Sequence, residues 1–347
     1  MRPILLSLCL LPLPALANDG FGGLSATGLT FSQTEDVALE TEDLFISPGR
    51  IVVSYQFRNL TDADVTGEVI FPLPPVPLGA LMQSDFNLPE DRNQEDLVSF
   101  TAKVAGRPVA TGIDRIAVIE PREEAGRAPA LSYDAPGRDV TADLEAWGIP
   151  LTLDVDRVAA HLLALSPAER AAVAAAGLAE FYPADPAMEG STDEAYPRWS
   201  IVTRYHWTQT FPAGQPLAIE HGYVNRAPGG IFVWQHPPRD DWSLDLARQY
   251  CIDEATSKGI AKRLKQADMD DAVGMALFID YVLRTANSWA GPIRLFRLTL
   301  DKGSERNLVS LCADGIKKTG PTTFVWEKRD FTPKRDLAIL LVSPMSN

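Results

Sequence analysis

The chain has 347 residues and is acidic, with 32 Lys and Arg against 46 Asp and Glu and a formal net charge of −14. This balance repels nucleic acid and anionic lipid surfaces, and no tract rich in Lys and Arg offsets it, so we expect no nucleic-acid partner. At roughly 150 residues per domain, the length predicts two domains or one large domain with a substantial apolar core.

The first seventeen residues, Met1–Ala17, have the pattern of a secretory signal peptide. Arg2 supplies a positive charge, residues 4–11 form an apolar run, and Ala15-Leu16-Ala17 matches a cleavage site. The run is shorter than the roughly 20 residues that a membrane-spanning helix needs. A lipoprotein anchor on Cys9 is disfavoured because a large residue precedes it. We therefore predict a periplasmic or secreted protein that keeps no stable membrane anchor after cleavage.

Two cysteines follow the predicted cleavage site, Cys251 and Cys312. An exported protein meets an oxidising environment, so the pair predicts a disulfide, with two buried free thiols as the alternative. The sequence has no C-x-x-C motif and no cysteine close to a histidine. It therefore predicts neither a metal site nor a cofactor.

Residues 18–115 are predicted to form an N-terminal β module. In residues 51–57 every second side chain is apolar and the others are mostly polar, which is typical of a half-buried strand. Similar patterns predict strands at 65–71 and 98–104, and a further one that starts at Val109.

Residues 116–195 are predicted to form an insertion of helices and loops. A short helix is expected over 141–147 with Thr141 as its N-cap, and a second over 154–165. The motif Ser166-Pro167-Ala168-Glu169 has the cap, the proline and the glutamate that start a third helix.

Residues 196–347 are predicted to form a C-terminal β module with helices. We expect residues 217–224 to pair with a strand over 199–211, and residues 277–285 and 293–300 to form a hairpin. Helices are predicted over 242–253 and 257–265, and further strands over 308–312, 323–327 and 337–342. The predicted fold class is mixed α+β and β-dominated, with two antiparallel β-sandwich-like modules and inserted helices.

Several blocks of residues in this order resemble an exported bacterial family known as domain of unknown function 4424. The blocks are Gly22-Gly23-Leu24, Glu42-Asp43-Leu44-Phe45-Ile46-Ser47, Phe71-Pro72-Leu73-Pro74, Trp207 with Phe211-Pro212, His221 with Tyr223, Trp289-Ala290-Gly291-Pro292-Ile293, Phe331-Thr332-Pro333 and Asp336-Leu337. The resemblance covers nearly the whole mature chain and implies an envelope location, without a mechanism. One departure is Asn225, because a proline is expected soon after the His-x-Tyr and the chain reaches one only at Pro228.

Common catalytic signatures are absent from the sequence, including G-x-S-x-G, H-E-x-x-H and the phosphate-binding glycine loops. No catalytic residue is assigned. His221 lies on the apolar face of its predicted strand, which favours a core histidine over a ligand or general base. The acidic groups Glu40, Glu42 and Asp43, and Asp268, Asp270 and Asp271, match no calcium loop and are interpreted as surface charge.

Aromatic residues are concentrated in the C-terminal module. Trp199, Tyr205 and Trp207 share one strand face, which favours a sandwich core over a sugar-stacking platform. Trp234, Trp242 and Trp289 fall next to or within predicted loops. Because recognition residues are often carried by loops on a rigid scaffold, these three tryptophans are expected to be exposed and to form a binding surface. Together with His221 they are the candidate ligand-binding residues.

Three functions fit these observations. The favoured one is a non-catalytic binding or interaction module of the envelope, with an envelope protein or a glycan as partner. The alternatives are a hydrolase that acts on cell-wall glycans and a structural envelope protein.

Overall fold

The computed structural model describes residues 20–25, 28–31, 34–73, 75–82, 87–120, 137–265 and 272–345. The predicted signal peptide lies outside these residues. Strands dominate the described chain and helices are few, so the predicted β-dominated α+β fold class is confirmed. No described helix is both long enough and apolar enough to cross a membrane.

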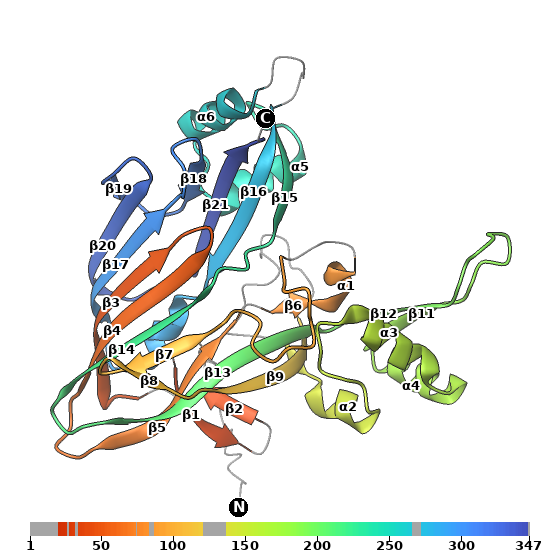
Figure 1. The fold of residues 1–347 in the computed structure, drawn as a ribbon, viewed down its shortest axis with the longest axis horizontal. Helices are drawn as coiled ribbons and strands as arrows, with labels where there is room; N and C mark the ends of the chain where they lie inside the picture. Colours follow the sequence, from red (N-terminus) through yellow and green to blue (C-terminus); the bar gives the residue numbers. More distant parts are fainter. Residues whose placement is uncertain are drawn as a thin grey trace, which may run out of the picture.

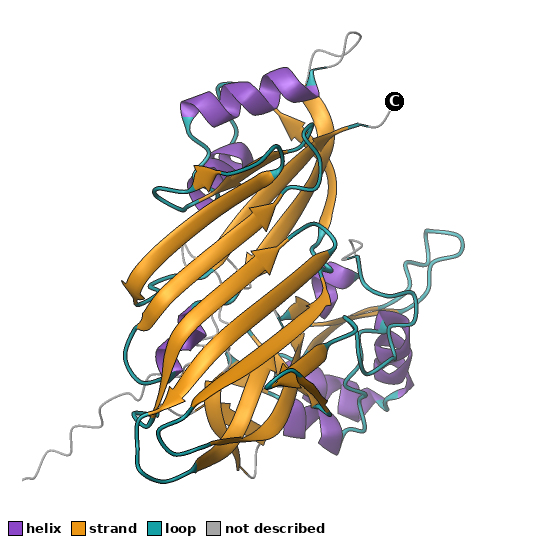
Figure 2. Ribbon diagram, turned by 60° about the vertical axis from the view of Figure 1, so that its left-hand side comes forward, coloured by secondary structure: helices purple, strands orange, loops and turns teal. Residues whose placement is uncertain are grey.

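An eight-stranded sheet forms one broad face of the molecule (Figure 2). Its order is β19-β20-β17-β3-β4-β14-β7-β8. The bounds in chain order are β3 (Val37–Ile46), β4 (Arg50–Asn59), β7 (Thr101–Val104), β8 (Arg107–Val109), β14 (Pro216–Val224), β17 (Ile293–Asp301), β19 (Lys317–Lys318) and β20 (Thr323–Phe331). The alternation in β4 is confirmed, since Ile51, Val53, Tyr55 and Phe57 are all buried.

A second sheet has seven strands and shares the main apolar core with the first. Its order is β10-β9-β13-β5-β1-β2, and β6 also pairs with β13. The bounds are β1 (Gly20–Ser25), β2 (Gly28–Phe31), β5 (Val65–Pro72), β6 (Val76–Pro77), β9 (Gly112–Ile119), β10 (Arg138–Asp139) and β13 (Ser200–Phe211). Trp199, Tyr205 and Trp207 point into this core and are almost fully buried, which confirms the core interpretation of that stripe.

Strands from the two predicted β modules pair with each other. β5 pairs with β13, and β4 with β14. β3 and β17 pair in parallel, although only antiparallel pairing was predicted. One core also contains residues from both modules and from the segment between them, for example Phe57, Leu162 and Phe296.

Two predicted pairings are wrong. Residues 199–211 and 217–224 are adjacent along the chain, but β13 and β14 lie in different sheets. The chain between them crosses from one layer of the sandwich to the other. Likewise, the predicted hairpin of 277–285 with 293–300 is absent, since β16 (Ala272–Tyr281) belongs to a third sheet while β17 pairs with β3 and β20. Sequence neighbours can pair across a tight turn, but the apolar faces here are buried by non-local partners.

The third sheet has four strands in the order β15-β16-β21-β18, with β15 (Gly229–Trp234), β18 (Leu308–Leu311) and β21 (Leu337–Pro344). Helices α5 (Asp241–Gln249) and α6 (Glu254–Leu264) lie at its upper end in Figure 1. A second apolar core fills the space between them and includes Phe232, Trp234 and Ile260. Asp240 and Asp253 cap the two helices by accepting from backbone N–H groups three residues on.

The predicted helical segment contains α2 (Thr141–Ala146), α3 (Val155–Ala164) and α4 (Pro167–Ala175), beside a small sheet of β11 (Ala179–Tyr182) and β12 (Glu194–Pro197). These elements lie together at the right of Figure 1. The capping box of Ser166 and Glu169 is confirmed. Thr141 is not an N-cap, because its hydroxyl accepts instead from the Ala117 N–H and ties α2 to β9. Two further short helices are α1 (Leu78–Leu81) and the 3-10 turn η1 (Arg284–Ser288).

Candidate functional site

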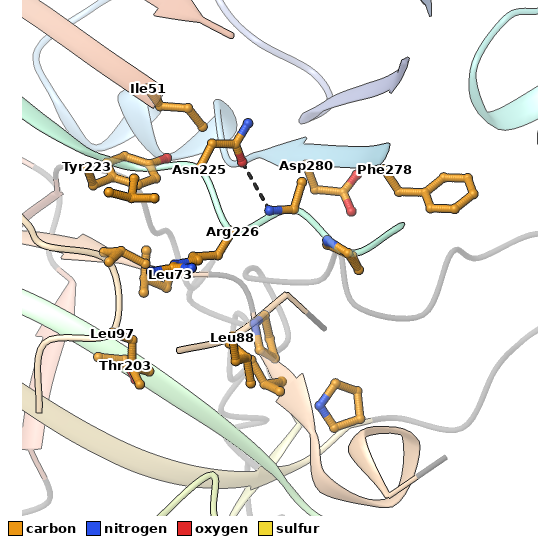
Figure 3. Close-up of a pocket in the computed structure, with 17 residues that line it drawn as sticks. Ile51, Leu73, Leu88, Leu97, Thr203, Tyr223, Asn225, Arg226, Phe278 and Asp280 are labelled. Carbon is orange, nitrogen blue, oxygen red and sulfur yellow. Dashed lines mark hydrogen bonds between the residues drawn. The ribbon is translucent and has the colours of Figure 1, made fainter. Parts of the chain in front are cut away.

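A cavity of about 330 Å³ lies where elements of all three large sheets meet (Figure 3). We call it the Asp280 cavity. The eight-stranded sheet contributes Ile51 and Tyr223, the seven-stranded sheet Thr203, and the four-stranded sheet Phe278 and Asp280. Most of the wall is apolar; examples are Ile51, Leu73, Val76, Leu88, Leu97 and Phe278. A concave and mostly apolar site with a few polar groups is the usual form of a small-molecule site.

One wall is the segment 225–228, which connects β14 to β15 and so crosses from one sheet to another. Asn225 is buried and fixes it, because Nδ2 donates to the Ser47 carbonyl at 2.8 Å and Oδ1 accepts from the Ala227 N–H at 3.2 Å. The Pro228 carbonyl accepts from the Phe278 N–H at 2.9 Å. The hydrogen-bonding groups of the Asn225 amide are therefore used in holding this wall.

Two charged side chains in the wall, Asp280 and Arg226, have buried atoms that are not used in such hydrogen bonds. Oδ1 of Asp280 and Nε of Arg226 are buried, and neither has a hydrogen-bond partner among the described residues. In Figure 3 the Arg226 side chain runs toward Leu73, whereas the Asp280 carboxyl lies beside Phe278. A buried polar atom without a partner costs free energy, so Oδ1 of Asp280 is suited to accept a hydrogen bond from a bound molecule and Nε of Arg226 to donate one to it.

The environment of Asp280 disfavours its charged form. Burial, together with the negative charge of Asp336, raises the pKa of the Asp280 carboxyl from 3.8 to about 6. Asp336 is itself fully engaged, since it accepts from the Leu283 and Arg284 backbone N–H groups and pairs with Arg284 at 3.0 Å. The tyrosine hydroxyl of Tyr250 also has a raised pKa, chiefly because it is buried and secondly because of the Asp280 charge.

His221 lies in the main core and not in the wall of the Asp280 cavity. It is 1% exposed, and its ring centroid lies 4.5 Å from that of Phe71 and 5.5 Å from those of Tyr55 and Phe100. His221 therefore has the core position that was predicted from its place on the apolar face of a strand.

The exposure expected for the loop tryptophans is wrong for two of the three. Trp234 is buried beneath α5 and α6, where its Nε1 donates to Ser257 Oγ at 3.1 Å. Trp289 is buried against Phe57, with ring centroids 4.5 Å apart. Only Trp242 is exposed, at 51%. Trp234 and Trp289 are buried because the chain at each position folds back onto an apolar core. The turn residues next to them in the sequence do not reveal that contact. Their binding role, and that of Trp242, stays a prediction.

The structure brings Cys251 and Cys312 to disulfide-bonding distance, as expected. Cys251 follows α5 and Cys312 follows β18, so the bond joins the helical layer to the edge of the four-stranded sheet.

The acidic candidates do not form a site in the described chain. The interpretation of Glu42 as surface charge is wrong, because its strand turns it into the core, where it is buried. Glu40 pairs with Arg58, and Asp43 with Arg297. Asp268, Asp270 and Asp271 lie outside the described residues. No group of three or more His, Cys, Asp or Glu side chains in the described ranges could hold a metal ion.

A family model described as "Domain of unknown function (DUF4424)" matches residues 17–340, which is nearly the whole chain. The chain belongs to this family. No curated protein matches the sequence. Among solved structures, the DUF4424 chain is similar to a crystal structure at 2.33 Å resolution described as a "putative nutrient binding protein" from Legionella pneumophila subsp. pneumophila str. Philadelphia 1. The two are 14% identical, the likeness covers 95% of this chain and 69% of the other, and the TM-score is 0.42.

Sequence reasoning missed both charged residues of the cavity in this DUF4424 protein. A signal for Asp280 was present, because it interrupts an apolar strand between two buried residues, Ile279 and Tyr281. A carboxylate at such a position is either paired or functional. Arg226 gave no comparable signal, since it follows a strand where a solvated arginine is ordinary.

Proposed function

We propose that this DUF4424 protein is an exported binding module of the periplasm or the extracellular space, and that its ligand occupies the Asp280 cavity. One observation carries the proposal: an apolar cavity large enough for a small molecule has buried Asp280 and Arg226 atoms in its wall that no described residue hydrogen-bonds. The cysteine pair at bonding distance supports an oxidising compartment.

The cavity wall is built to keep its shape without a ligand. The Val224 N–H donates to the Val98 carbonyl at 2.7 Å, and Asn225 is bonded to both Ser47 and Ala227. These bonds join the segment 225–228 to two other parts of the chain. A preformed site loses little conformational entropy when a ligand binds, which favours affinity.

Binding of the uncharged fluorescent probe N-phenyl-1-naphthylamine tests the proposal. We compare the wild type with Leu88→Trp, which fills the cavity, and with Leu60→Trp, which adds the same side chain in an exposed turn. We expect saturable fluorescence in the wild type and in L60W, and at least a tenfold weaker Kd in L88W. Thermal unfolding followed by circular dichroism verifies that both variants fold.

Equal probe affinity in folded L88W and L60W would overturn the cavity as the binding site. The absence of saturable binding in the wild type would contradict the proposal as well.

A further inference from the structure

The two charged groups of the Asp280 cavity need opposite partners. The Asp280 carboxylate has Asp336 as its charged neighbour, which repels it, and the cation beside them, Arg284, is committed to Asp336 at 3.0 Å. No ion pair to Asp280 is formed within the described part of the chain. A protonated amine on a ligand would supply both the missing charge and the missing hydrogen bond to Oδ1.

Arg226 needs a partner of negative charge. Its Nε is buried without an acceptor from any described residue, and its side chain extends toward Leu73, away from Asp280 (Figure 3). A guanidinium binds a carboxylate through parallel N–H donors, so a carboxylate fits this end of the cavity best.

We propose that the ligand is a zwitterion with an apolar body, whose amine binds Asp280 and whose carboxylate binds Arg226. This inference rests on the proposed function and adds the chemical class of the ligand. A purely anionic ligand would place negative charge toward Asp280, and a purely cationic one positive charge toward Arg226. The rest of the wall, which includes Leu88, Leu97 and Val98, accepts apolar groups. Short apolar peptides and long ω-amino acids both have this chemistry.

The raised pKa of Asp280 supports the same assignment. A carboxylate that is destabilised in the empty cavity regains free energy when a cation neutralises it. Another polar group of the cavity wall, the buried amide of Asn225, is already bonded to Ser47 and Ala227 and does not compete for the ligand.

Isothermal titration at pH 7.5 with matched probes tests this inference. The probes are leucyl-leucine, its N-acetyl derivative without the amine charge, its amide without the carboxylate, and 8-aminooctanoate as a second zwitterion. The variants are Asp280→Asn and Arg226→Gln. Exposed Asp62→Asn and Arg107→Gln are the charge-matched controls.

We expect at least one zwitterion to bind, and removal of either of its charges to weaken binding about tenfold to a hundredfold. D280N should lose the same factor for the zwitterion and no longer distinguish it from the form without an amine charge. R226Q should lose the same factor for the zwitterion and no longer distinguish it from the form without the carboxylate. D62N and R107Q should bind the zwitterion as the wild type does.

Two results separate failure of this inference from failure of the proposed function. If N-phenyl-1-naphthylamine binds in the cavity but neither zwitterion does, the zwitterion is overturned and the binding module stands. The same holds if the acetylated and amidated peptides bind as tightly as leucyl-leucine. If L88W affects no probe, both proposals fail.

Discussion

Asn225 Nδ2 donates to the Ser47 carbonyl oxygen at 2.8 Å and so ties the end of β14 to the turn between β3 and β4. The same side chain accepts from the Ala227 N–H at 3.2 Å. A proline near this position would fix the backbone without reaching Ser47 through a side chain. Asparagine therefore holds the wall of the Asp280 cavity by hydrogen bonds.

Replacement of Asn225 by Leu should lower the free energy of unfolding by about 1–3 kcal/mol, because it leaves the partly buried Ser47 carbonyl and the buried Ala227 N–H without their partner. Urea denaturation measures the change. Thr66→Ala is the control, since it removes an exposed hydrogen bond to Thr210 and should cost less than about 0.5 kcal/mol. A loss in N225L no larger than in T66A would contradict the role of Asn225.

Asp280→Asn should make the unliganded protein more stable at neutral pH. The folded-state pKa of Asp280 is raised from 3.8 to about 6, so the folded protein binds a proton more readily than the unfolded chain. Stability therefore falls as the pH rises from about 4 to above 6, and the ionised carboxylate opposes folding at pH 7. The rise of roughly two pKa units corresponds to about 2–3 kcal/mol.

Urea denaturation of wild type and D280N between pH 4 and pH 8 checks this prediction. We expect the advantage of D280N to be largest above pH 6.5 and to become small near pH 4, where Asp280 is protonated in the folded state and its unfolded-state carboxyl is close to its pKa of 3.8. The charged and titratable groups nearby are Asp336, its partner Arg284, and Tyr250. An advantage that is the same at all pH values would show that packing, and not the charge, sets the difference.

The sequence predicted the local elements of this fold better than their partners. Alternation in residues 51–57 identified β4, and Ser166 with Glu169 identified the start of α4, because both signals depend on neighbours along the chain. The pairing of β3 with β17 brings together residues such as Leu44 and Leu298, which lie far apart in sequence. Nothing local specifies that contact.

The same distinction explains the candidate site. His221 was correctly favoured as a core residue because parity on one strand was sufficient to place it. The burial of Trp289 depends on Phe57 and Phe211, which arrive from other strands. The Asp280 cavity depends on the meeting of three sheets, so its charged groups could be found only after the sheets were assembled.

Reduction of the Cys251–Cys312 bond should destabilise the protein. The bond closes a loop with a sequence separation of 61 residues, for which chain entropy gives at most about 4 kcal/mol. Thermal unfolding with and without a reductant, together with the intact mass after alkylation, measures the effect. The double variant Cys251→Ser, Cys312→Ser should melt at the temperature of the reduced protein. An unreduced protein in which both thiols are alkylated would exclude the disulfide.

Two tryptophans that looked alike in the sequence should respond differently to truncation. Trp289→Ala removes a ring that is 3% exposed and packs 4.5 Å from Phe57 and 5.7 Å from Phe211, between centroids. The loss of apolar burial and the cavity that remains should cost about 3–5 kcal/mol. Trp242→Ala removes a ring that is 51% exposed, so less apolar area leaves the core and the cost should stay below about 1 kcal/mol.

Urea denaturation of both variants gives the comparison, and titration of each with N-phenyl-1-naphthylamine adds a second readout. Neither ring lines the Asp280 cavity, so the affinity of W242A for the probe should equal that of the wild type. A weaker affinity in W242A at unchanged stability would move the binding surface to the exposed face of α5.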